Sequence, residues 1–161
     1  MEDWKEYKLE DVCQRLKSGK GINAQKISIQ GKYPVIGGNG LRGYTDEANF
    51  IGQAAIIGRQ GAYCGNVRYF NGAGYMTEHA IVVVGNELAN TKYLSCKLSL
   101  MKLGHLSAQS AQPGLFVQLL SKLPIKLPTI EEQNAVAAII QSLDDKIELN
   151  RRINDNLTAI A

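Results

Sequence analysis

The stretch that decides the fold lies in the last third of the chain and reads Leu123-Pro124-Ile125-Lys126-Leu127-Pro128-Thr129-Ile130-Glu131-Glu132-Gln133. Thr129 and Glu132 have the spacing of a capping box, in which each side chain bonds the backbone N–H of the other residue and so starts a helix. From Ile130 to Ala161 the sequence contains no Gly or Pro. At 1.5 Å per residue this predicts a helix about 48 Å long, which is longer than a small domain needs. We therefore expect the helix to project and to bind a partner.

One side of this predicted helix carries apolar residues and asparagines at steps of three and four, the spacing of a coiled-coil seam. The seam consists of Ile140, Leu143, Ile147, Asn150, Asn154 and Leu157. Asn at such positions fixes the register of paired helices at some cost in stability. The pattern therefore predicts a helix that pairs with another helix. The alternative is an ordinary amphipathic helix that lies on its own domain.

Composition limits the size and location of the protein. The chain has 161 residues, of which 45% are hydrophobic, and this suffices for one compact domain with an extension. We place the domain at residues 1–128 and the helix at residues 129–161. The sequence has no leader-like start and no apolar run of membrane-spanning length, so we expect a cytoplasmic protein without a membrane partner.

The charge is unevenly distributed between these two parts. Residues 1–128 carry 15 Lys and Arg against 9 Asp and Glu, whereas residues 129–161 carry 3 against 6. A basic domain favours a polyanionic partner, because neutralising phosphates releases counterions. The excess is modest, and many ordinary domains match it.

The body consists of short apolar runs bounded by Gly or Asn. These runs have the length of strands and lie at residues 33–36, 54–57, 66–70 and 80–84. Helical spacing predicts helices from Leu9 to Leu16, from Thr91 to Met101 and from Leu115 to Leu120. The predicted class is α+β, a glycine-rich mixed β core with short helices, followed by one long coiled-coil-type helix.

Catalytic and cofactor signatures are weak. Gly38-Asn39-Gly40-Leu41-Arg42-Gly43 satisfies G-x-G-x-x-G, but no good helix follows and no acidic residue lies between Glu47 and Glu78, so we interpret these glycines as turns. No G-x-S-x-G, Walker or H-E-x-x-H motif is present. Cys13, Cys64 and Cys96 are widely spaced, and we interpret them as reduced thiols. We predict no catalytic residue and no metal site.

Polar side chains on the glycine-rich loops have the chemistry for reading nucleic acid. Arg favours guanine and Gln favours adenine in the major groove, and Lys binds phosphate. Such residues are also common on any surface. The basic loop at Lys17 and Lys20 is equally typical of a helix C-terminus with a Gly beyond it.

Together these segments resemble the DNA-specificity subunit of type I restriction-modification systems, over nearly the whole chain. The segments that carry the resemblance are Trp4 with residues 9–16 and Gly19; residues 33–40 with 43–44; residues 56–67; residues 77–80; residues 109–114; and residues 127–133. Their order and spacing are more specific than any one of them.

The resemblance implies a target-recognition domain that reads one half of a split site in double-stranded DNA, followed by a helix that sets the spacing. It also implies methyltransferase and restriction subunits as partners, with S-adenosylmethionine, ATP and magnesium bound by those partners and no cofactor on this chain. A full subunit of the family has two such domains and two antiparallel helices. This chain, with one of each, is then either a fragment or a bacterial or archaeal half-subunit that pairs with itself or with a second recognition domain.

The residues chosen as DNA contacts rest on chemistry and loop position, because recognition domains diverge where they read bases. They are Lys20, Lys26, Arg42, Arg59, Tyr63, His79, Gln109 and Gln112. Two other functions remain open. The chain could be an interaction module or decoy that binds methyltransferase subunits, or a stand-alone DNA methyltransferase or nuclease.

Overall fold

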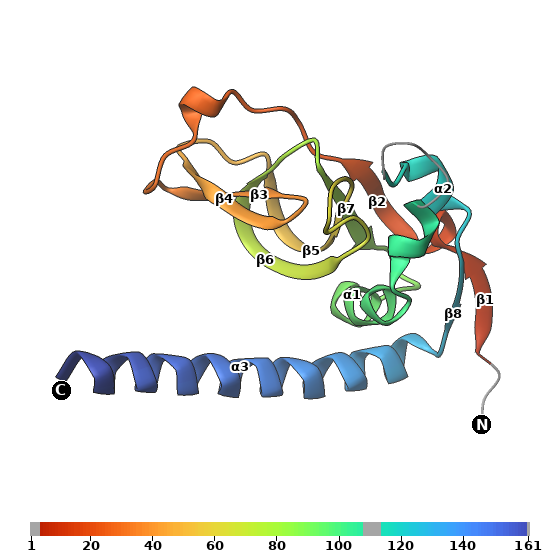
Figure 1. The fold of residues 1–161 in the computed structure, drawn as a ribbon. Coiled ribbons are helices and arrows are strands. Elements are labelled where there is room, and N and C mark those ends of the chain that lie inside the picture. Colours follow the sequence, from red (N-terminus) through yellow and green to blue (C-terminus); the bar gives the residue numbers. More distant parts are fainter. Residues whose placement is uncertain (1–3, 108–113, 161) are drawn as a thin grey trace.

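The computed structural model describes residues 4–107 and 114–160, and it has a mixed β body with one long helix beside it (Figure 1). Six strands form the main sheet in the order β2-β7-β5-β6-β3-β4. Their bounds are β2 Cys13–Ser18, β3 Tyr33–Gly37, β4 Gly40–Thr45, β5 Phe50–Gly58, β6 Val67–Met76 and β7 Ala80–Gly85. Neighbouring strands are antiparallel, except that β3 runs parallel to β6. A separate sheet pairs β1 (Lys5–Lys8) with β8 (Pro124–Leu127).

The helices are short, apart from the last. They are the 3-10 turns η1 (Leu9–Val12), η2 (Ala24–Lys26) and η3 (Leu103–Ser107), and the α-helices α1 (Thr91–Leu100), α2 (Val117–Ser121) and α3 (Ile130–Ile160). Asn90 caps the N-terminus of α1, and its side chain accepts a hydrogen bond from the backbone N–H of Tyr93 at 3.0 Å. This is the usual N-cap arrangement. The predicted α+β class with a long C-terminal helix is confirmed.

The main sheet has a core on each of its two faces. Ala55 and Ile57 of β5 point into the larger core with the buried leucines of α1 and α2, whereas Ala54 and Ile56 point into a smaller core with Phe50. Because alternate residues of a strand point to opposite faces, a strand that is buried on both faces reads as a continuous apolar run. This explains the unbroken run in β5, and β7 has the same character at Ala80–Val83.

The N-terminal helix predicted from Leu9 to Leu16 is wrong. Leu9 and Val12 are buried in the single 3-10 turn η1, and the chain then enters strand β2, in which Leu16 lies opposite Val83 of β7. One tight turn gives the same i, i+3 spacing as a longer helix, so the two cannot be told apart by spacing alone. Lys17 is accordingly a strand residue rather than part of a helix end.

The glycine motif at residues 38–43 belongs to a hairpin. Gly40 and Gly43 have φ angles of +96° and +143°, which side chains disfavour. Strand β4 begins at Gly40 and pairs back onto β3, with a register shift between Val35 and Ile36. Gly38 and Gly40 therefore lie at the turn of a hairpin, as predicted, whereas Gly43 lies within β4 beside the register shift.

Helix α3 begins with the predicted capping box. The N–H of Thr129 donates to Glu132 Oε2 at 3.0 Å, and the N–H of Glu132 donates to Thr129 Oγ1 at 3.3 Å. One turn further on, the Gln133 side chain is fully buried. Its Nε2 donates to the carbonyls of Leu88 and Pro128, and its Oε1 accepts from the N–H of Asn90. The start of α3 is thereby fastened to the loop before α1.

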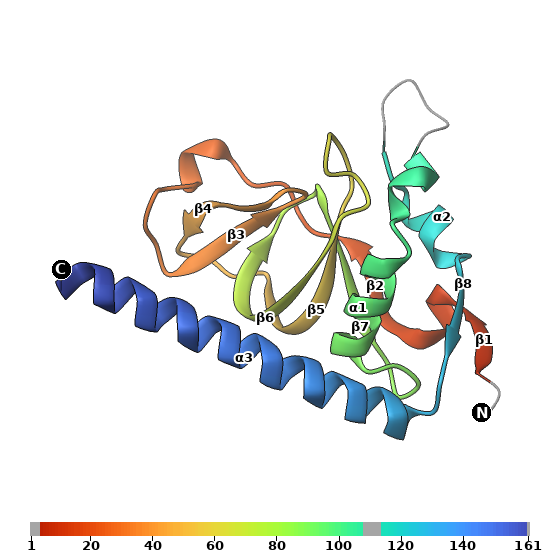
Figure 2. The same ribbon diagram turned by 60° about the horizontal axis from the view of Figure 1, so that its bottom comes forward.

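The two ribbon views place α1 between the sheet and α3 (Figures 1 and 2). From α1 onward, α3 runs under the body towards the side of β6 and β4 (Figure 2). The described side chains at positions 145–158 are all exposed. The first half of α3 is therefore attached to the body, and its second half is open to a partner. The division of the chain into units 1–128 and 129–161 stays a prediction.

Candidate nucleic-acid interface

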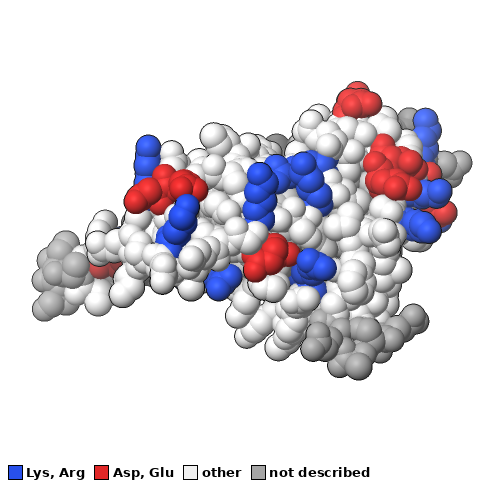
Figure 3. All heavy atoms as spheres, turned by 90° about the horizontal axis from the view of Figure 1, so that it is seen from above, with Lys and Arg blue, Asp and Glu red and all other residues white. Residues whose placement is uncertain are grey.

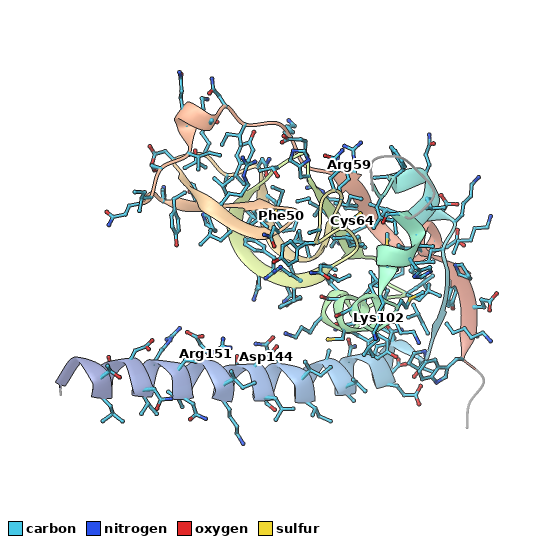
Figure 4. The ribbon with its side chains drawn as sticks, in the orientation of Figure 1. Phe50, Arg59, Cys64, Lys102, Asp144 and Arg151 are labelled. Atoms are coloured by element: carbon cyan, nitrogen blue, oxygen red, sulfur yellow. The ribbon has the colours of Figure 1, made fainter. Side chains whose placement is uncertain are left out.

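The candidate interface is the face of the body on the side opposite α3. Seen from this side, Lys and Arg side chains gather in the middle of the face, with acidic side chains beside them and towards both ends (Figure 3). Arg59 lies on this face, at the top of the body and opposite α3 (Figure 4). Several strand ends and loops meet there, and they position the side chains described next.

Three segments meet at Arg59, just after the last residue of β5. Its N–H donates to the carbonyl of His79 at 2.9 Å, and its carbonyl accepts from the N–H of Leu115 at 2.8 Å. A Cβ on Gly38 would lie 2.9 Å from the His79 carbonyl oxygen. The close approach of these backbones explains why glycine occupies position 38. The contact thus brings the β3–β4 hairpin to the same place.

The guanidinium of Arg59 lies beside an exposed aromatic ring. Its Cζ is 5.9 Å from the centre of the Phe116 ring, and 55% of Phe116 is exposed. A cation at this distance from an exposed ring is weakly attracted to it. Phe116 is not among the residues predicted from the sequence, although a large apolar residue at the N-terminus of a short helix, two residues after Gly114, is an available signal.

The next group of polar side chains lies at the turn between β6 and β7. His79 Nε2 is 3.2 Å from Glu78 Oε1, and neither His79 Nδ1 nor Glu78 Oε2 has a hydrogen-bond partner among the described residues. The hydroxyl of Thr77 is also fully buried and unpaired. Buried polar atoms without partners are uncommon in folded proteins. Hydrogen-bonding capacity is therefore free at this turn.

Two basic side chains flank the same turn. The backbone N–H of Lys20 donates to the Met76 carbonyl at 2.9 Å, which fixes the loop after β2 next to the turn. The side chain of Arg42 lies over Gly37, where a Cβ would be 2.7 Å from Arg42 Cδ. Lys20 and Arg42 are both exposed. Both residues lie close to the turn that holds His79. Gly38 and the N–H of Arg59 both approach the carbonyl of His79, so the turn, the hairpin and Arg59 lie together.

The remaining predicted DNA contacts lie elsewhere or outside the description. Tyr63 is 46% exposed on the loop between β5 and β6, near Arg59 along the chain. Lys26 is separate, on η2, where its Nζ pairs with Glu47 Oε1 at 3.1 Å. Both of these side chains are more than half exposed, so this ion pair adds little to stability. Gln109 and Gln112 lie outside the described residues.

The predicted helix seam is mostly exposed. Leu143, Ile147 and Leu157 are each at least half exposed, and Asn150 and Asn154 are exposed as well. Ile140 differs, because it is half-buried on the same side of α3 as the buried Ala137. Other exposed apolar residues on α3 are Val136, Ile139, Leu149 and Ile153. So many apolar side chains on one exposed helix indicate a contact surface.

The described part of the chain also bears on the predictions for metal ligands, cysteines and membrane spans. No group of three His, Cys, Asp or Glu side chains that could hold a metal ion occurs in residues 4–107 and 114–160. Cys13, Cys64 and Cys96 are free, and burial raises the pKa of the Cys13 thiol to about 12. None of the described helices is long and apolar enough to cross a membrane.

Sequence comparison shows which family this arrangement belongs to. The family described as "Type I restriction modification DNA specificity domain" matches residues 1–159. The chain belongs to this family, as the resemblance predicted. It is 42% identical over 135 residues to the specificity subunit of the type I restriction enzyme EcoprrI from Escherichia coli, which covers 81% of this chain and 33% of that subunit. It is 24% identical over 141 residues to a putative type I specificity subunit from Mycoplasma pneumoniae, which covers 83% of this chain and 46% of that protein.

Solved structures of S subunits have the same fold. The S subunit of a type I restriction-modification system from M. genitalium superimposes with a TM-score of 0.78 at 20% identity, over 96% of this chain and 44% of that one. The HsdS subunit from Thermoanaerobacter tengcongensis gives a TM-score of 0.65 at 15% identity, over 94% of this chain and 40% of that one. The chain thus spans between a third and a half of the length of these relatives.

Proposed function

We propose that this chain reads one half of a bipartite site in double-stranded DNA as the non-catalytic specificity element of a type I restriction-modification complex. The observation that carries the proposal is the gathering of Arg59, His79, Lys20 and Arg42 around the contact between the end of β5, the β6–β7 turn and the β3–β4 hairpin. Arginine can bind a guanine edge with two hydrogen bonds, and lysine can neutralise a phosphate. Family membership supports the same role.

Partner subunits would carry the chemistry in this proposal. Methyltransferase subunits would bind S-adenosylmethionine, and restriction subunits would bind ATP and magnesium, so this chain would supply the address alone. One solved structure with the same fold, at a TM-score of 0.72, is described as concerning complex assembly and conformational transition of the type I restriction-modification system. A cytoplasmic location in a bacterial or archaeal cell goes with this role.

The test is methylated-base sequencing of DNA from a host that expresses this chain together with its methyltransferase subunit. We expect a bipartite motif that is absent when the methyltransferase is expressed alone. Arg59→Ala should weaken binding of the assembled complex to the motif by about 5- to 150-fold, which corresponds to one bidentate base contact. Lys126→Ala removes one charge from β8, where Lys126 pairs weakly with Glu6 at 3.8 Å, and should leave binding unchanged.

One result would change the role of Arg59, and two others would contradict the proposal itself. Equal loss of specific and non-specific affinity in Arg59→Ala would make Arg59 a phosphate contact rather than a base contact. Binding of the methyltransferase without any motif would favour an interaction module or decoy. Methylation by the purified chain without partners would favour an enzyme.

We further propose that α3 pairs with a second α3 in antiparallel orientation. Among the exposed residues of α3, alternate steps of three and four connect a continuous seam, which reads Val136, Ile139, Leu143, Lys146, Asn150, Ile153 and Leu157. This seam keeps three of the predicted residues, Leu143, Asn150 and Leu157. It replaces the half-buried Ile140 with its exposed neighbour Ile139, and it replaces Ile147 and Asn154 with their neighbours Lys146 and Ile153.

The spacing of this seam is symmetric. Ile139 and Leu157 lie nine residues on either side of Glu148, and Leu143 and Ile153 lie five residues on either side. In an antiparallel pair with its two-fold axis at Glu148, each of these residues meets an apolar residue of the other helix. Lys146 would then meet Asn150 of the other helix, so the central layers are polar. Polar residues in a seam specify register, and two-fold pairing would make the half-sites inverted repeats.

A cross-linking experiment can separate the possible orientations. Chains with Leu143→Cys are mixed with chains carrying Ile153→Cys, in a background in which the three native cysteines are replaced. Antiparallel pairing predicts a disulfide in the mixture and little in either chain alone. A disulfide between two Leu143→Cys chains would indicate parallel pairing, and a monomer at all concentrations would refute self-pairing.

A further inference from the structure

We propose that Lys92 is a positioning residue that fixes the angle between α3 and the DNA-reading body through its ion pair with Asp144. Lys92 belongs to α1, and its side chain is only 8% exposed. Its Nζ donates to Asp144 Oδ2 of α3 and lies 4.0 Å from the centre of the Tyr69 ring of β6. One buried ammonium group therefore connects the helix, the sheet and α3. The functional part of this inference rests on the proposed DNA-reading role.

The pair provides a second point of attachment for α3. The first is Gln133, which is held by the loop before α1. Asp144 follows eleven residues later, which places it about 16 Å further along the helix. A single attachment point would act as a pivot, whereas two points define a direction. Beyond Asp144 all described side chains are exposed up to position 158, so within the described residues this pair is the last polar link between α3 and the body.

Because Lys92 is buried, losing its ion pair with Asp144 costs more free energy than losing an ion pair on the surface. A lysine that is withdrawn from water and loses its counter-ion is strongly destabilising, because its charge is then uncompensated. If α3 swung away from the body, Asp144 would leave and Lys92 would keep only the Tyr69 ring. The position of Lys92 therefore opposes this movement. Asp144 itself is half exposed and lies on the side of α3 that faces the body (Figure 4).

The angle of α3 would determine how two recognition domains sit on DNA. Without this pair α3 would pivot at Gln133, and from there to Ile160 the helix runs for about 40 Å. A swing of about 10° over that length moves the tip by about 7 Å, which is close to the rise of two base pairs. If two copies of α3 are paired, the same swing changes the separation of the two half-sites. Lys92 would then influence spacer length without touching DNA.

The experiment is a distance measurement by double electron–electron resonance on the full chain. Spin labels are placed at Ile29, which is 91% exposed on the body, and at Asn156, which is exposed on α3, after replacement of the native cysteines. Excess unlabelled chain removes distances between molecules. We expect one narrow distance distribution for the unchanged pair, and a distribution at least twice as wide, or shifted by several ångströms, for Lys92→Met and for Asp144→Asn.

Two matched controls keep the measurement specific. Lys97→Met removes an ammonium group from the same helix, where it lies 4.8 Å from the Trp4 ring. Asp145→Asn removes the neighbouring carboxylate, which bonds Gln141 within α3. Both controls should leave the distance distribution unchanged. Asp144→Glu keeps a carboxylate at this position and should give a narrow distribution like that of the unaltered chain. An unchanged distribution in Asp144→Asn would overturn the inference even if Lys92→Met failed to fold, because Asp144 is half exposed and its replacement leaves Lys92 in place.

A second readout separates this inference from the proposed function. In the assembled methyltransferase complex, Asp144→Asn should relax the spacer length of the methylated motif and leave the half-site bases unchanged. A wider distance distribution with an unchanged spacer would refute the functional role of the angle. Absence of any motif with the unaltered chain would refute the proposed function, and the distance measurement would still decide the role of Lys92.

Discussion

Gln133 connects α3 to the body, and its replacement by alanine is the sharpest test of this joint. The side chain is fully buried and makes three hydrogen bonds to backbone groups. Gln133→Ala removes both the donor and the acceptor, and the N–H of Asn90 and the carbonyls of Leu88 and Pro128 lose their partner. The change therefore breaks the first attachment of α3 while leaving the helix propensity high.

The expected cost follows from the number of groups left without a partner. Each net hydrogen bond contributes about 1 kcal/mol, and a backbone group left unpaired in a buried site costs about 1–3 kcal/mol. Leu88 is 40% exposed, so water can reach part of the joint and the lower end of the range applies. We expect Gln133→Ala to lower the free energy of unfolding by about 3 kcal/mol, measured by urea denaturation followed by circular dichroism.

Two further variants show whether the hydrogen bonds are responsible. Gln141→Ala removes a glutamine of the same helix whose Nε2 bonds exposed Asp145 at 2.7 Å, and it should cost less than about 0.5 kcal/mol. Gln133→Glu keeps the shape and the acceptor for Asn90 but turns a carboxylate towards two carbonyl oxygens, so it should be as destabilising as alanine at pH 7. A cost below about 1 kcal/mol for Gln133→Ala would refute the reasoning, because it would mean that the joint repacks or hydrates freely.

Three other predictions follow from local geometry. Gly65 and Gly61 both have positive φ angles, but only Gly65 is closely surrounded. A Cβ on Gly65 would lie 2.2 Å from a backbone nitrogen of η3, whereas a Cβ on Gly61 would meet nothing within 4 Å. In urea denaturation, Gly65→Ala should therefore lower the free energy of unfolding by more than about 3 kcal/mol, and Gly61→Ala by about 1 kcal/mol. Because burial raises the pKa of Cys13 to about 12 from 9.0, its alkylation by iodoacetamide at pH 8, followed by mass spectrometry, should be at least about 100-fold slower than that of a free thiol. The same shift stabilises the fold fully below about pH 9, and this contribution is lost as the pH rises towards 12. Phe116→Leu should weaken DNA binding of the assembled complex by about 2- to 5-fold and Phe116→Tyr should not, if the ring holds the guanidinium of Arg59; equal effects would exclude the ring's role.

The elements that could be predicted from sequence are those whose signals are local. The capping box at Thr129 and the Asn90 cap each set a helix start with side chains close to the backbone groups that they bond. Buried strands such as β5 are visible as apolar runs because both of their faces lie in a core. In each case the residues that define the element are neighbours in the chain.

Strand β4 escaped prediction because its stability comes from elsewhere. Gly40–Thr45 has two glycines with positive φ and only two large apolar residues, so its own preference for a strand is weak. Its pairing with β3 and the bridge between Tyr44 and Ser28 supply the missing hydrogen bonds. Tertiary context overrides weak local preference in such a segment.

The candidate site was predictable as a set of residue types but not as a constellation. Arg59 and Phe116 are far apart in the sequence, and the contact between the ends of β5, β7 and the segment before α2 brings them together. Lys92 and Asp144 are likewise 52 positions apart. No periodicity relates such pairs, so only the fold can reveal them.

The distribution of polar contacts along α3 has a physical logic. Its first half is attached through hydrogen bonds and an ion pair, made by the buried Gln133 and by Asp144 with the buried Lys92 of α1. Such polar contacts have a defined direction, whereas apolar packing tolerates sliding. Its second half keeps exposed apolar residues, which gain from burial against any complementary helix. If the proposed pairing holds, a helix fastened directionally at one end and apolar at the other would transmit its orientation from the body to a partner. The long helix would then work as a rigid extension of the body only as long as the Lys92 and Gln133 contacts persist.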